Sequence, residues 1–406
     1  GACLSTMLDG IWVVLLLLPV AAASGWYARG RSRDPDEPAA PVNADYLRGI
    51  SHLVNDDADR AIAAFVRLLD VDNDTAETHI ALGNLFRRQG EVDRALRVHQ
   101  NLVARPNLKA AHRNQARYEL AQDYLRAGVL DRAENLFREL ADQNLFLDRS
   151  LTGLIAIYEQ ERDWSQAIET TRRLETVRGT SLRPVIAQYF CELAEQARSE
   201  GAHEALQRHL KAARHSFRDC ARASLIAGAV AEQGGEHRAA IRAYRQILRQ
   251  DAAFISEIVE PMRRCHAALH DERGYAQFLR ELMPLCDGAH PHVAYARLLQ
   301  RQGRVDEAIA HISQYLQSEP NWIGFYHLLD LTWSQTRSNL TGPLDSLRQS
   351  LGRIIERQAL YHCGQCGFAG RYLHWQCPSC RQWNTVTPVR DVRPGETAPT
   401  RSARLL

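Results

Sequence analysis

The distribution of hydrophobic and polar residues divides the chain into three parts. Residues 11–28 are almost continuously apolar. From about residue 45 to residue 345, apolar positions recur in the pattern of successive amphipathic helices separated by short polar turns. The last part, from residue 361 onward, is short and holds four closely spaced cysteines. The pattern therefore predicts an apolar N-terminal segment, a long helical array and a small C-terminal module.

The apolar run has the character of a membrane-spanning helix. Its length is near the lower limit for crossing a hydrocarbon layer of about 30 Å. Trp12 lies at one end, and Trp26 and Tyr27 lie at the other, where aromatic side chains favour the membrane–water interface. We therefore expect residues 8–28 to form a transmembrane anchor.

The charges around the run predict its orientation. Three arginines follow it, Arg29, Arg31 and Arg33, and no Lys or Arg precedes it. The positive-inside rule then places the N-terminus on the outer side of the membrane and the rest of the chain in the cytoplasm. A cleaved signal peptide is the alternative, but its basic residues would come before the apolar run. We expect residues 29–44, which are rich in proline and charge, to be a linker.

The clearest helical repeat runs from His79 to Pro106. A Leu-Gly pair ending at Gly83 is followed three residues later by Phe86, and twelve residues after the glycine comes Ala95. A glycine at this point would let two helices approach closely, and the alanine would pack into their contact. This pattern resembles the tetratricopeptide repeat.

Small residues recur at matching positions along the chain. The alanines expected to anchor the second helices are Ala61, Ala95, Ala133, Ala167, Ala240 and Ala308. An irregular bundle with chance matches is the alternative, but it would not keep both the spacing and the residue type. We predict an all-α repeat array over residues 45–345, closed by a capping helix over residues 346–360. Such arrays form solenoids whose concave groove binds a peptide or helix of another protein.

The turns between paired helices combine glycine and aspartate. Asp93, Asp131 and Asp306 each follow a glycine by three residues. Glycine suits the end of a helix, and aspartate suits the position just before the next one. We therefore expect these aspartates to cap the second helices.

The C-terminal cysteines have the spacing of a metal site. They form two Cys-x-x-Cys pairs separated by ten residues: Cys363, Cys366, Cys377 and Cys380. Two such pairs supply four sulfurs for one tetrahedral ion, zinc or iron, and leave no position open for water or substrate. Two disulfides or four free thiols are the alternatives. We expect Gly364 and Gly367 to provide sharp turns, and residues 361–390 to form a module too small to fold without its metal.

Other residues near this module have simpler interpretations. We interpret His362 and His374 as surface residues, because four thiolates already complete the shell. Four aromatic residues would give the module an apolar surface that packs on the array: Phe368, Tyr372, Trp375 and Trp383. Residues 391–406 have the composition of a disordered tail. The remaining cysteines have no framework spacing, which favours a reducing compartment: Cys3, Cys191, Cys220, Cys265 and Cys286.

Composition and motifs argue against several classes of function. The chain has 406 residues, 45% of them hydrophobic, and a net charge of +2. This near-neutral balance does not favour a nucleic-acid binder that works by bulk electrostatics. No phosphate-binding loop, dinucleotide fingerprint, nucleophile elbow or His-Glu-x-x-His motif is present, so we expect no enzymatic activity and no catalytic residues.

The order of anchor, repeats and metal module resembles the bacterial lipopolysaccharide assembly protein B family. The resemblance rests on three stretches: residues 15–27, residues 189–194, and the two cysteine pairs with Gly367-Phe368 and Pro378. In that family the metal module is rubredoxin-like, so the resemblance implies that the four cysteines are ligands of one iron or zinc ion. The chain departs from an ordinary rubredoxin by its short interval between the pairs and by Arg381, where the second pair usually has a glycine.

The resemblance also implies a function. The family comprises inner-membrane adaptors that limit lipopolysaccharide synthesis by presenting the committed deacetylase of lipid A synthesis to the membrane protease FtsH. On this basis the expected partners are FtsH, the deacetylase and other lipopolysaccharide assembly proteins, with a second copy of the chain as a further candidate. The alternatives are a general scaffold for lipopolysaccharide enzymes, a rubredoxin-type electron carrier, and a nucleic-acid-binding zinc ribbon.

Overall fold

The computed structural model describes residues 75–286, 288–335 and 341–389. It divides the chain into two compact units, the first ending at Leu140 and the second beginning at Ala141. Each unit consists of helical pairs, and the second also contains the cysteine module. This arrangement confirms the predicted helical repeats and the small C-terminal metal-binding fold.

Several predicted segments lie outside the described residues. These are the anchor (8–28), the linker (29–44), the first repeat around Ala61 and the tail (391–406). Across the described ranges, no helix combines the length and the apolar character needed to cross a membrane.

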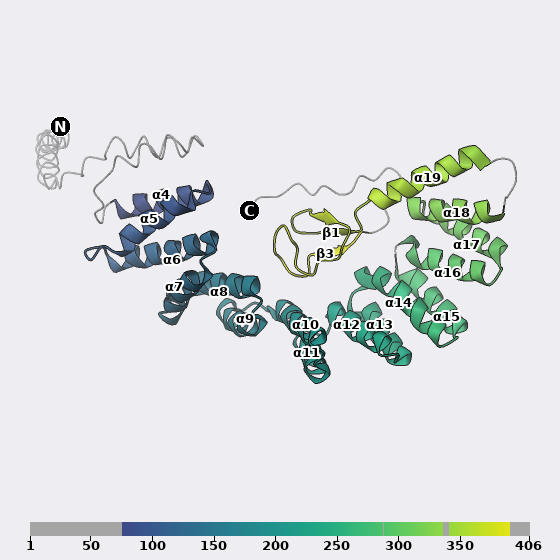
Figure 1. The fold of residues 1–406 in the computed structure, drawn as a ribbon, viewed down its shortest axis with the longest axis horizontal. Helices are drawn as coiled ribbons and strands as arrows, with labels where there is room; N and C mark the ends of the chain where they lie inside the picture. The colour runs from purple at the N-terminus through teal and green to yellow at the C-terminus, as the bar shows by residue number, and fades with distance from the viewer. Residues whose placement is uncertain (1–74, 287, 336–340, 390–406) are drawn as a thin grey trace, which may run out of the picture. The chain divides into compact units, whose positions relative to one another are not determined.

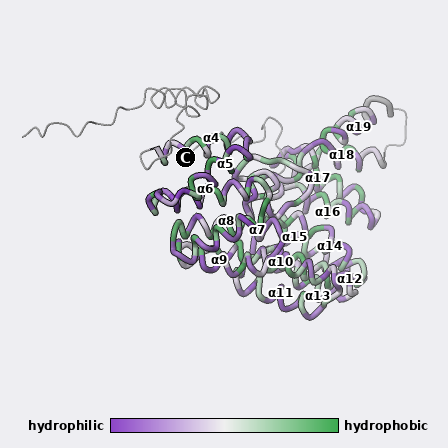
Figure 2. The backbone as a smooth tube through the Cα atoms, turned by 60° about the vertical axis from the view of Figure 1, so that its left-hand side comes forward, coloured by the Kyte–Doolittle hydropathy of each residue, from purple (hydrophilic) through white to green (hydrophobic). Residues whose placement is uncertain are grey.

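The helices follow one another as pairs joined by short turns (Figure 1). The α-helices are α4 (Ala76–Arg88), α5 (Val92–Val103), α6 (Ala110–Ala127), α7 (Leu130–Asp142), α8 (Leu147–Glu161), α9 (Trp164–Arg178), α10 (Arg183–Ser199), α11 (His203–Ser216), α12 (Ala221–Gln233), α13 (His237–Gln250), α14 (Ile255–Ala268), α15 (Glu272–Leu282), α16 (Ala289–Arg301), α17 (Val305–Ser318), α18 (Trp322–Gln335) and α19 (Thr341–Arg357). Two 3₁₀ turns, η1 (Ala252–Phe254) and η2 (Met283–Leu285), lie between them. Hydrophobic and hydrophilic residues alternate within these helices, so each can bury one face (Figure 2).

Glycines reverse the chain between paired helices, as expected. Gly90, Gly128 and Gly303 have φ values of +84°, +76° and +76°, a left-handed conformation that glycine adopts without steric cost. The expectation that the aspartates cap the second helices is wrong. The turn is so short that α5, α7 and α17 each begin one residue before the aspartate. The carboxylate therefore lies inside the first turn, where the helix dipole favours a negative charge.

Small residues set how closely paired helices approach, as the sequence predicted. A β-carbon on Gly83 would lie 2.4 Å from Nε2 of His99, and one on Gly228 would lie 2.3 Å from the ring of Tyr244. In both pairs a ring from the second helix occupies the space that the missing side chain leaves. The predicted anchor alanines within the described residues are fully buried: Ala95, Ala133, Ala167, Ala240 and Ala308.

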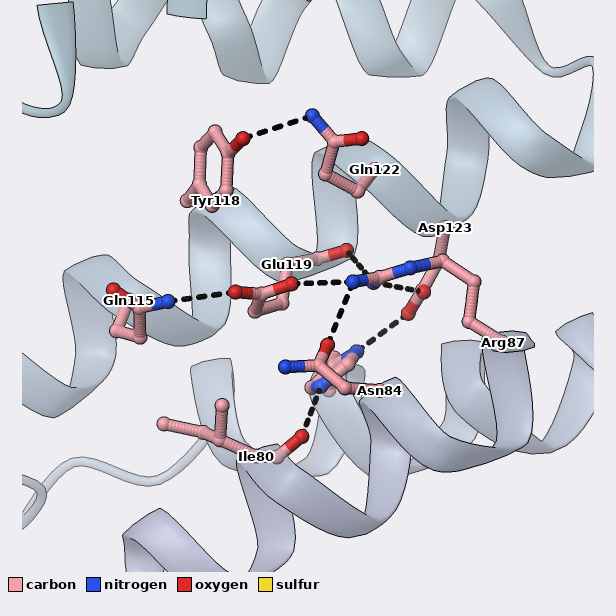
Figure 3. A network of polar contacts seen from close by, with 9 residues as sticks. Ile80, Asn84, Arg87, Gln115, Tyr118, Glu119, Gln122 and Asp123 are labelled. Carbon is pink, nitrogen blue, oxygen red and sulfur yellow. Dashed lines mark hydrogen bonds and ion pairs between the residues drawn. The ribbon is translucent and has the colours of Figure 1, made fainter. Parts of the chain in front are cut away.

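In the first unit, a polar network joins α4, α5 and α6. The Arg87 guanidinium donates to Glu119 Oε2 over 2.6 Å and to Asp123 Oδ1 over 2.7 Å. His99 Nδ1 lies 2.5 Å from Asp123 Oδ2, and both of these side chains are fully buried. Figure 3 shows Arg87 reaching from α4 to both carboxylates on α6. Because each buried carboxylate faces a donor, the network can hold the two helical pairs in register.

The second unit ends in a small antiparallel sheet. Its strands are β1 (Tyr361–Cys363), β2 (Ala369–Gly370) and β3 (Val386–Pro388), in the order β2-β1-β3. Tyr361 pairs with Gly370 on one side and with Pro388 on the other. Only three residues separate the end of α19 from β1, so the sheet follows the last helix directly.

Candidate metal centre and its contact with the repeats

Each cysteine pair lies in a turn closed by a backbone hydrogen bond. Gly367 N–H donates to the carbonyl of Cys363 over 3.0 Å, and Arg381 N–H donates to the carbonyl of Cys377 over 2.9 Å. Gly367 and Arg381 hold equivalent places and have φ values of +77° and +57°. For arginine this left-handed conformation costs about 1–2 kcal/mol.

The two glycines of the first pair differ in their roles. The expected sharp turn occurs at Gly367, which has a positive φ. Gly364 has no such requirement, because its φ is not positive and a β-carbon there would lie 3.9 Å from the nearest atom, the carbonyl oxygen of Thr385. Its backbone N–H instead donates to that carbonyl over 2.8 Å. Only one of the two predicted turn glycines is therefore required by the backbone.

The four sulfurs form a cluster of the right size for one ion. All four lie within 4.8 Å of one another, with 3.8 Å between Cys363 and Cys380 and 3.6 Å between Cys366 and Cys377. Four sulfurs placed tetrahedrally at about 2.3 Å from a zinc ion are about 3.8 Å apart. The cluster therefore fits one tetrahedral ion, and the four cysteines are not paired as disulfides.

The surroundings shift the pKa values of two of the four thiols in opposite directions. Burial opposes ionisation of Cys363, but the Thr385 hydroxyl 3.3 Å from its sulfur and nearby backbone N–H groups lower its pKa to about 6. Desolvation raises the pKa of Cys380 to about 12, against the opposing effect of a backbone hydrogen bond. A bound cation would expel the remaining protons, because only thiolates ligate well.

The histidines near the cysteines lie outside the cluster. Within the described chain, the cluster of potential ligands contains the four cysteines alone. His374 is exposed and its ring lies 6.0 Å from that of Phe368, while His362 is half-buried on β1. The interpretation as a surface residue therefore agrees with the exposure of His374, whereas His362 is partly covered, and neither histidine belongs to the ligand cluster.

The module packs against the repeats through Trp383. Its indole N–H donates to Glu159 Oε1 of α8 over 2.7 Å, and the same oxygen accepts from the Tyr189 hydroxyl of α10 over 2.6 Å. Gln376 Nε2 donates to the other Glu159 oxygen over 3.0 Å. The Trp383 ring meets those of Trp164 and Tyr189 edge-on, with centroids 6.2 and 5.6 Å away. One carboxylate thus receives three hydrogen bonds, two of them from the module.

A second set of contacts joins the module to α10. Gln188 Nε2 donates to Asn384 Oδ1 over 2.5 Å, and Asn384 Nδ2 donates to the carbonyl of Pro184 over 3.3 Å. Arg222, one helical pair further on, lies 3.3 Å from Gln188 Oε1. These polar groups are oriented by one another, which fixes the position of the loop before β3.

Trp375 and Tyr361 extend the contact to α12 and α14. The Trp375 ring stacks on Phe254 with centroids 5.0 Å apart, and the Arg222 guanidinium lies 5.7 Å from the same indole. The Tyr361 hydroxyl donates to Glu257 Oε1 over 3.0 Å. Burial raises the pKa of Glu257, although this hydrogen bond opposes the shift. The module therefore contacts the first helices of four successive pairs: α8, α10, α12 and α14.

The sequence predicted part of this contact. Trp375 and Trp383 pack on the repeats as expected, whereas Phe368 lies in the module's own core and Tyr372 is 78% exposed. The helical partners Glu159, Gln188 and Glu257 were missed, because isolated polar residues on helices look like solvated positions. Tyr189 had a signal, since it belongs to one of the stretches that carry the family resemblance.

These features define the class of protein. Paired helices with small residues at their contacts, and a four-cysteine module seated on them, make a tetratricopeptide-repeat protein with a C-terminal metal-binding domain. The family described as rubredoxin metal binding domain matches residues 361–388, and the tetratricopeptide repeat family matches residues 46–107 and 190–253.

Whole-chain relatives identify the family. Lipopolysaccharide assembly protein B of Escherichia coli (strain K12) is 33% identical over 383 residues, covering 94% of this chain and 98% of the relative. The protein of the same name from Haemophilus influenzae is 30% identical over 393 residues, and the alignment covers 93% of this chain and 98% of the relative. The chain belongs to the lipopolysaccharide assembly protein B family. Among solved structures, a tetratricopeptide repeat protein from Parabacteroides merdae aligns over 71% of this chain and 97% of its own, with 12% identity and a TM-score of 0.33.

Proposed function

We propose that this chain is a non-enzymatic adaptor of the bacterial inner membrane that regulates lipopolysaccharide synthesis. In this proposal, residues 8–28 anchor it and the repeats and metal module lie in the cytoplasm. It presents the committed lipid A deacetylase to the membrane protease FtsH. Family membership supports the link to lipopolysaccharide, since the relatives are named as assembly proteins. The observation that carries the adaptor role is the seating of the module across four successive helical pairs.

The residues of the chain would act by binding and positioning. Cys363, Cys366, Cys377 and Cys380 would hold one zinc or iron ion, which supplies the structural crosslink that a module of this size needs. Glu159 and Gln188 then hold the module against the repeats. A helical array fixed in this way offers protein partners a preformed surface, which reduces the entropy lost on binding. The anchor confines adaptor and protease to one membrane and so raises their effective concentration.

The metal ligands provide the test of this proposal. Replacing both Cys363 and Cys366 by serine should unfold the module and let the deacetylase accumulate in cells that carry the variant. Cys286→Ser is a matched control, because this half-buried cysteine lies in the repeats, outside the cluster. Immunoblots of the deacetylase over time after protein synthesis is blocked would measure its lifetime. An unchanged lifetime in the double variant, with the adaptor present at normal level, would refute the proposal.

A general scaffold for lipopolysaccharide enzymes is the second candidate. The relatives' names, which refer to assembly, favour it, and a helical array can gather several proteins as well as one. Crosslinking in intact membranes followed by mass spectrometry separates the two. The adaptor predicts FtsH and the deacetylase among the crosslinked partners, whereas the scaffold predicts several synthetic enzymes without the protease.

The identity of the ion tests another alternative, an electron carrier. An iron site would give a visible charge-transfer spectrum that dithionite bleaches, and a zinc site would be colourless. The adaptor requires only that the ion holds the module together. An iron site whose reduced form passes its electron to a partner protein would argue for the electron carrier.

A further inference from the structure

Two cysteines outside the metal centre lie in direct contact. Cys191, in the middle of α10, and Cys220, the residue before α12, have their sulfur atoms 3.7 Å apart. Both are buried, with 0% and 2% of their surface exposed, and neither is in a disulfide. The sequence had suggested only scattered thiols, because the two positions are 29 residues apart along the chain. The fold brings them together by stacking one helical pair on the next.

The surroundings make the two sulfurs unequal. The Cys191 thiol hydrogen-bonds to the Cys220 sulfur and lowers the pKa of Cys220, and the backbone N–H groups of Ala223 and Arg222 at the start of α12 act in the same direction against burial. The same hydrogen bond, together with burial, raises the pKa of Cys191 well above its usual value. The pair therefore comprises a thiolate-prone sulfur at a helix N-terminus and a neighbouring protonated thiol. Reactive dithiols in other proteins have this arrangement.

We propose that Cys191 and Cys220 form a reversible oxidation site, at which hydrogen peroxide converts the two thiols into one disulfide that joins α10 to the start of α12. The inference concerns residues that the proposed function does not use. Its basis is the sulfur–sulfur contact between successive helical pairs and the position of Cys220 at a helix N-terminus.

The reaction takes place in two balanced steps. The Cys220 sulfur attacks one peroxide oxygen, so that an S–O bond forms, the O–O bond breaks, and hydroxide leaves and takes up the proton that Cys220 has released. The Cys191 sulfur then attacks the Cys220 sulfur. An S–S bond forms, the S–O bond breaks, and the departing hydroxide leaves as water with the Cys191 proton. Two thiols are oxidised, and one peroxide is reduced to two waters.

Burial selects the oxidant. Neither sulfur faces solvent, so a reagent must enter while the repeats open locally. A small neutral molecule such as hydrogen peroxide can enter through a smaller opening than a bulky disulfide or an alkylating reagent needs. The sulfurs must also approach each other by about 1.7 Å to reach bonding distance. The pair is therefore expected to stay reduced in a reducing compartment and to respond to peroxide rather than to larger oxidants.

The site lies beside a contact of the metal module. Gln188 Nε2 lies 4.0 Å from the Cys220 sulfur and donates to Asn384 Oδ1 over 2.5 Å. Oxidation would move the Cys220 sulfur towards Cys191 and so alter its contact with Gln188. The disulfide would thus form next to Gln188, which hydrogen-bonds to Asn384 of the module.

The test is peptide mapping of the full chain, purified in detergent with its metal bound so that the four clustered thiolates are protected. After treatment with hydrogen peroxide, free thiols are blocked in denaturant and the protein is digested. We expect a disulfide-linked peptide pair containing Cys191 and Cys220, with the free thiols of these two residues lost together. Dithiothreitol should restore both thiols. This experiment needs no variant, so a folding defect cannot obscure it.

Single variants then assign the order of the steps. Cys191→Ser should leave a sulfenic acid on Cys220 that dimedone traps once the oxidised protein is unfolded in denaturant, and Cys220→Ser should leave Cys191 reduced. Cys265→Ser is the matched control, because Cys265 is also fully buried and burial raises its pKa to about 11. This control should form the Cys191–Cys220 bond as the wild type does. The inference fails if both thiols remain reduced at a peroxide concentration that oxidises Cys286, or if either is oxidised only irreversibly.

Discussion

Replacing Trp383 by alanine tests how firmly the metal module is held on the repeats. Trp383 is only 9% exposed, its indole N–H donates to Glu159, and its ring packs against Trp164 and Tyr189. Removing a buried tryptophan side chain costs about 3–5 kcal/mol, which includes the cavity left behind. A loss of this size lowers the equilibrium constant for docking by roughly a hundred- to several-thousand-fold. We therefore expect the alanine variant to populate an undocked module while its helices remain folded.

Hydrogen–deuterium exchange with mass spectrometry measures how far the metal module of the Trp383→Ala variant has undocked from the repeats. Amides of β1 and β3 and of the first turns of α10 should exchange faster in the variant, whereas those of α16 and α17 should be unaffected. Trp383→Phe keeps most of the ring and loses only the N–H donor, so its effect should be smaller, about 1–3 kcal/mol. Tyr372→Ala is the matched control, because this aromatic residue of the same module is 78% exposed and should change nothing.

If Trp383→Ala exchanges at the wild-type rate throughout the module and α10, the contacts of the indole do not hold the module in place. Equal acceleration in Tyr372→Ala would show that any aromatic loss destabilises the module itself, and would refute the specific role of the Glu159 contact.

Three further substitutions test other parts of the structure. Burial raises the pKa of Glu257, so its contribution to the free energy of unfolding is present below the unfolded pKa of 4.5 and is lost as pH rises through the higher folded pKa. Glu257→Gln still accepts the hydrogen bond from Tyr361 and should reduce the fall in melting temperature between about pH 4 and pH 8. A fall equal to that of the wild type would contradict this. Asp123→Asn removes the buried carboxylate that pairs with Arg87 and His99, and should lower the free energy of unfolding of the first unit by about 3–5 kcal/mol in urea. The control is Glu77→Gln, a change at an exposed carboxylate, which should lower it by less than about 0.5 kcal/mol. Gly228→Ala would place a β-carbon 2.3 Å from the ring of Tyr244 and should lower the free energy of unfolding by about 1–3 kcal/mol or more. The control is Gly234→Ala, whose β-carbon would lie 3.5 Å from the nearest atom, and equal melting temperatures of the two variants would contradict the packing argument.

The parts of the fold that follow from local sequence were predictable. Gly83 and Ala95 predicted the close contact between the two helices of one pair, because the geometry of that pair alone requires small residues at both positions. The spacing of Cys363 and Cys366 likewise reflects one turn of backbone. A pattern that repeats, or that lies within a few residues, can be read from the sequence without knowledge of the rest of the molecule.

The contacts between distant segments could not be predicted in this way. Trp383 and Glu159 are 224 residues apart, and no spacing links an indole on a loop to one glutamate among many on helices. The Cys191–Cys220 contact was missed for the same reason, since it depends on how one helical pair stacks on the next. His99 packs on Gly83 as Tyr244 packs on Gly228 in a later pair, and this position follows from the repeat pattern. Its hydrogen-bond partner Asp123 lies on α6, in the next helical pair, and could not be predicted from that pattern.

The position of Glu159 has a consequence for how this protein is made. The helix that carries it leaves the ribosome long before Trp383 is synthesised, yet its carboxylate gains two of its three hydrogen bonds only when the last segment arrives. In repeat arrays each repeat ordinarily packs only on its neighbours, but here a helix in the middle of the array completes its contacts only after Gln376 and Trp383 have been synthesised. A nascent or prematurely terminated chain would therefore expose to water the carboxylate of Glu159 and the aromatic rings of Trp164 and Tyr189, which Trp383 covers in the complete chain.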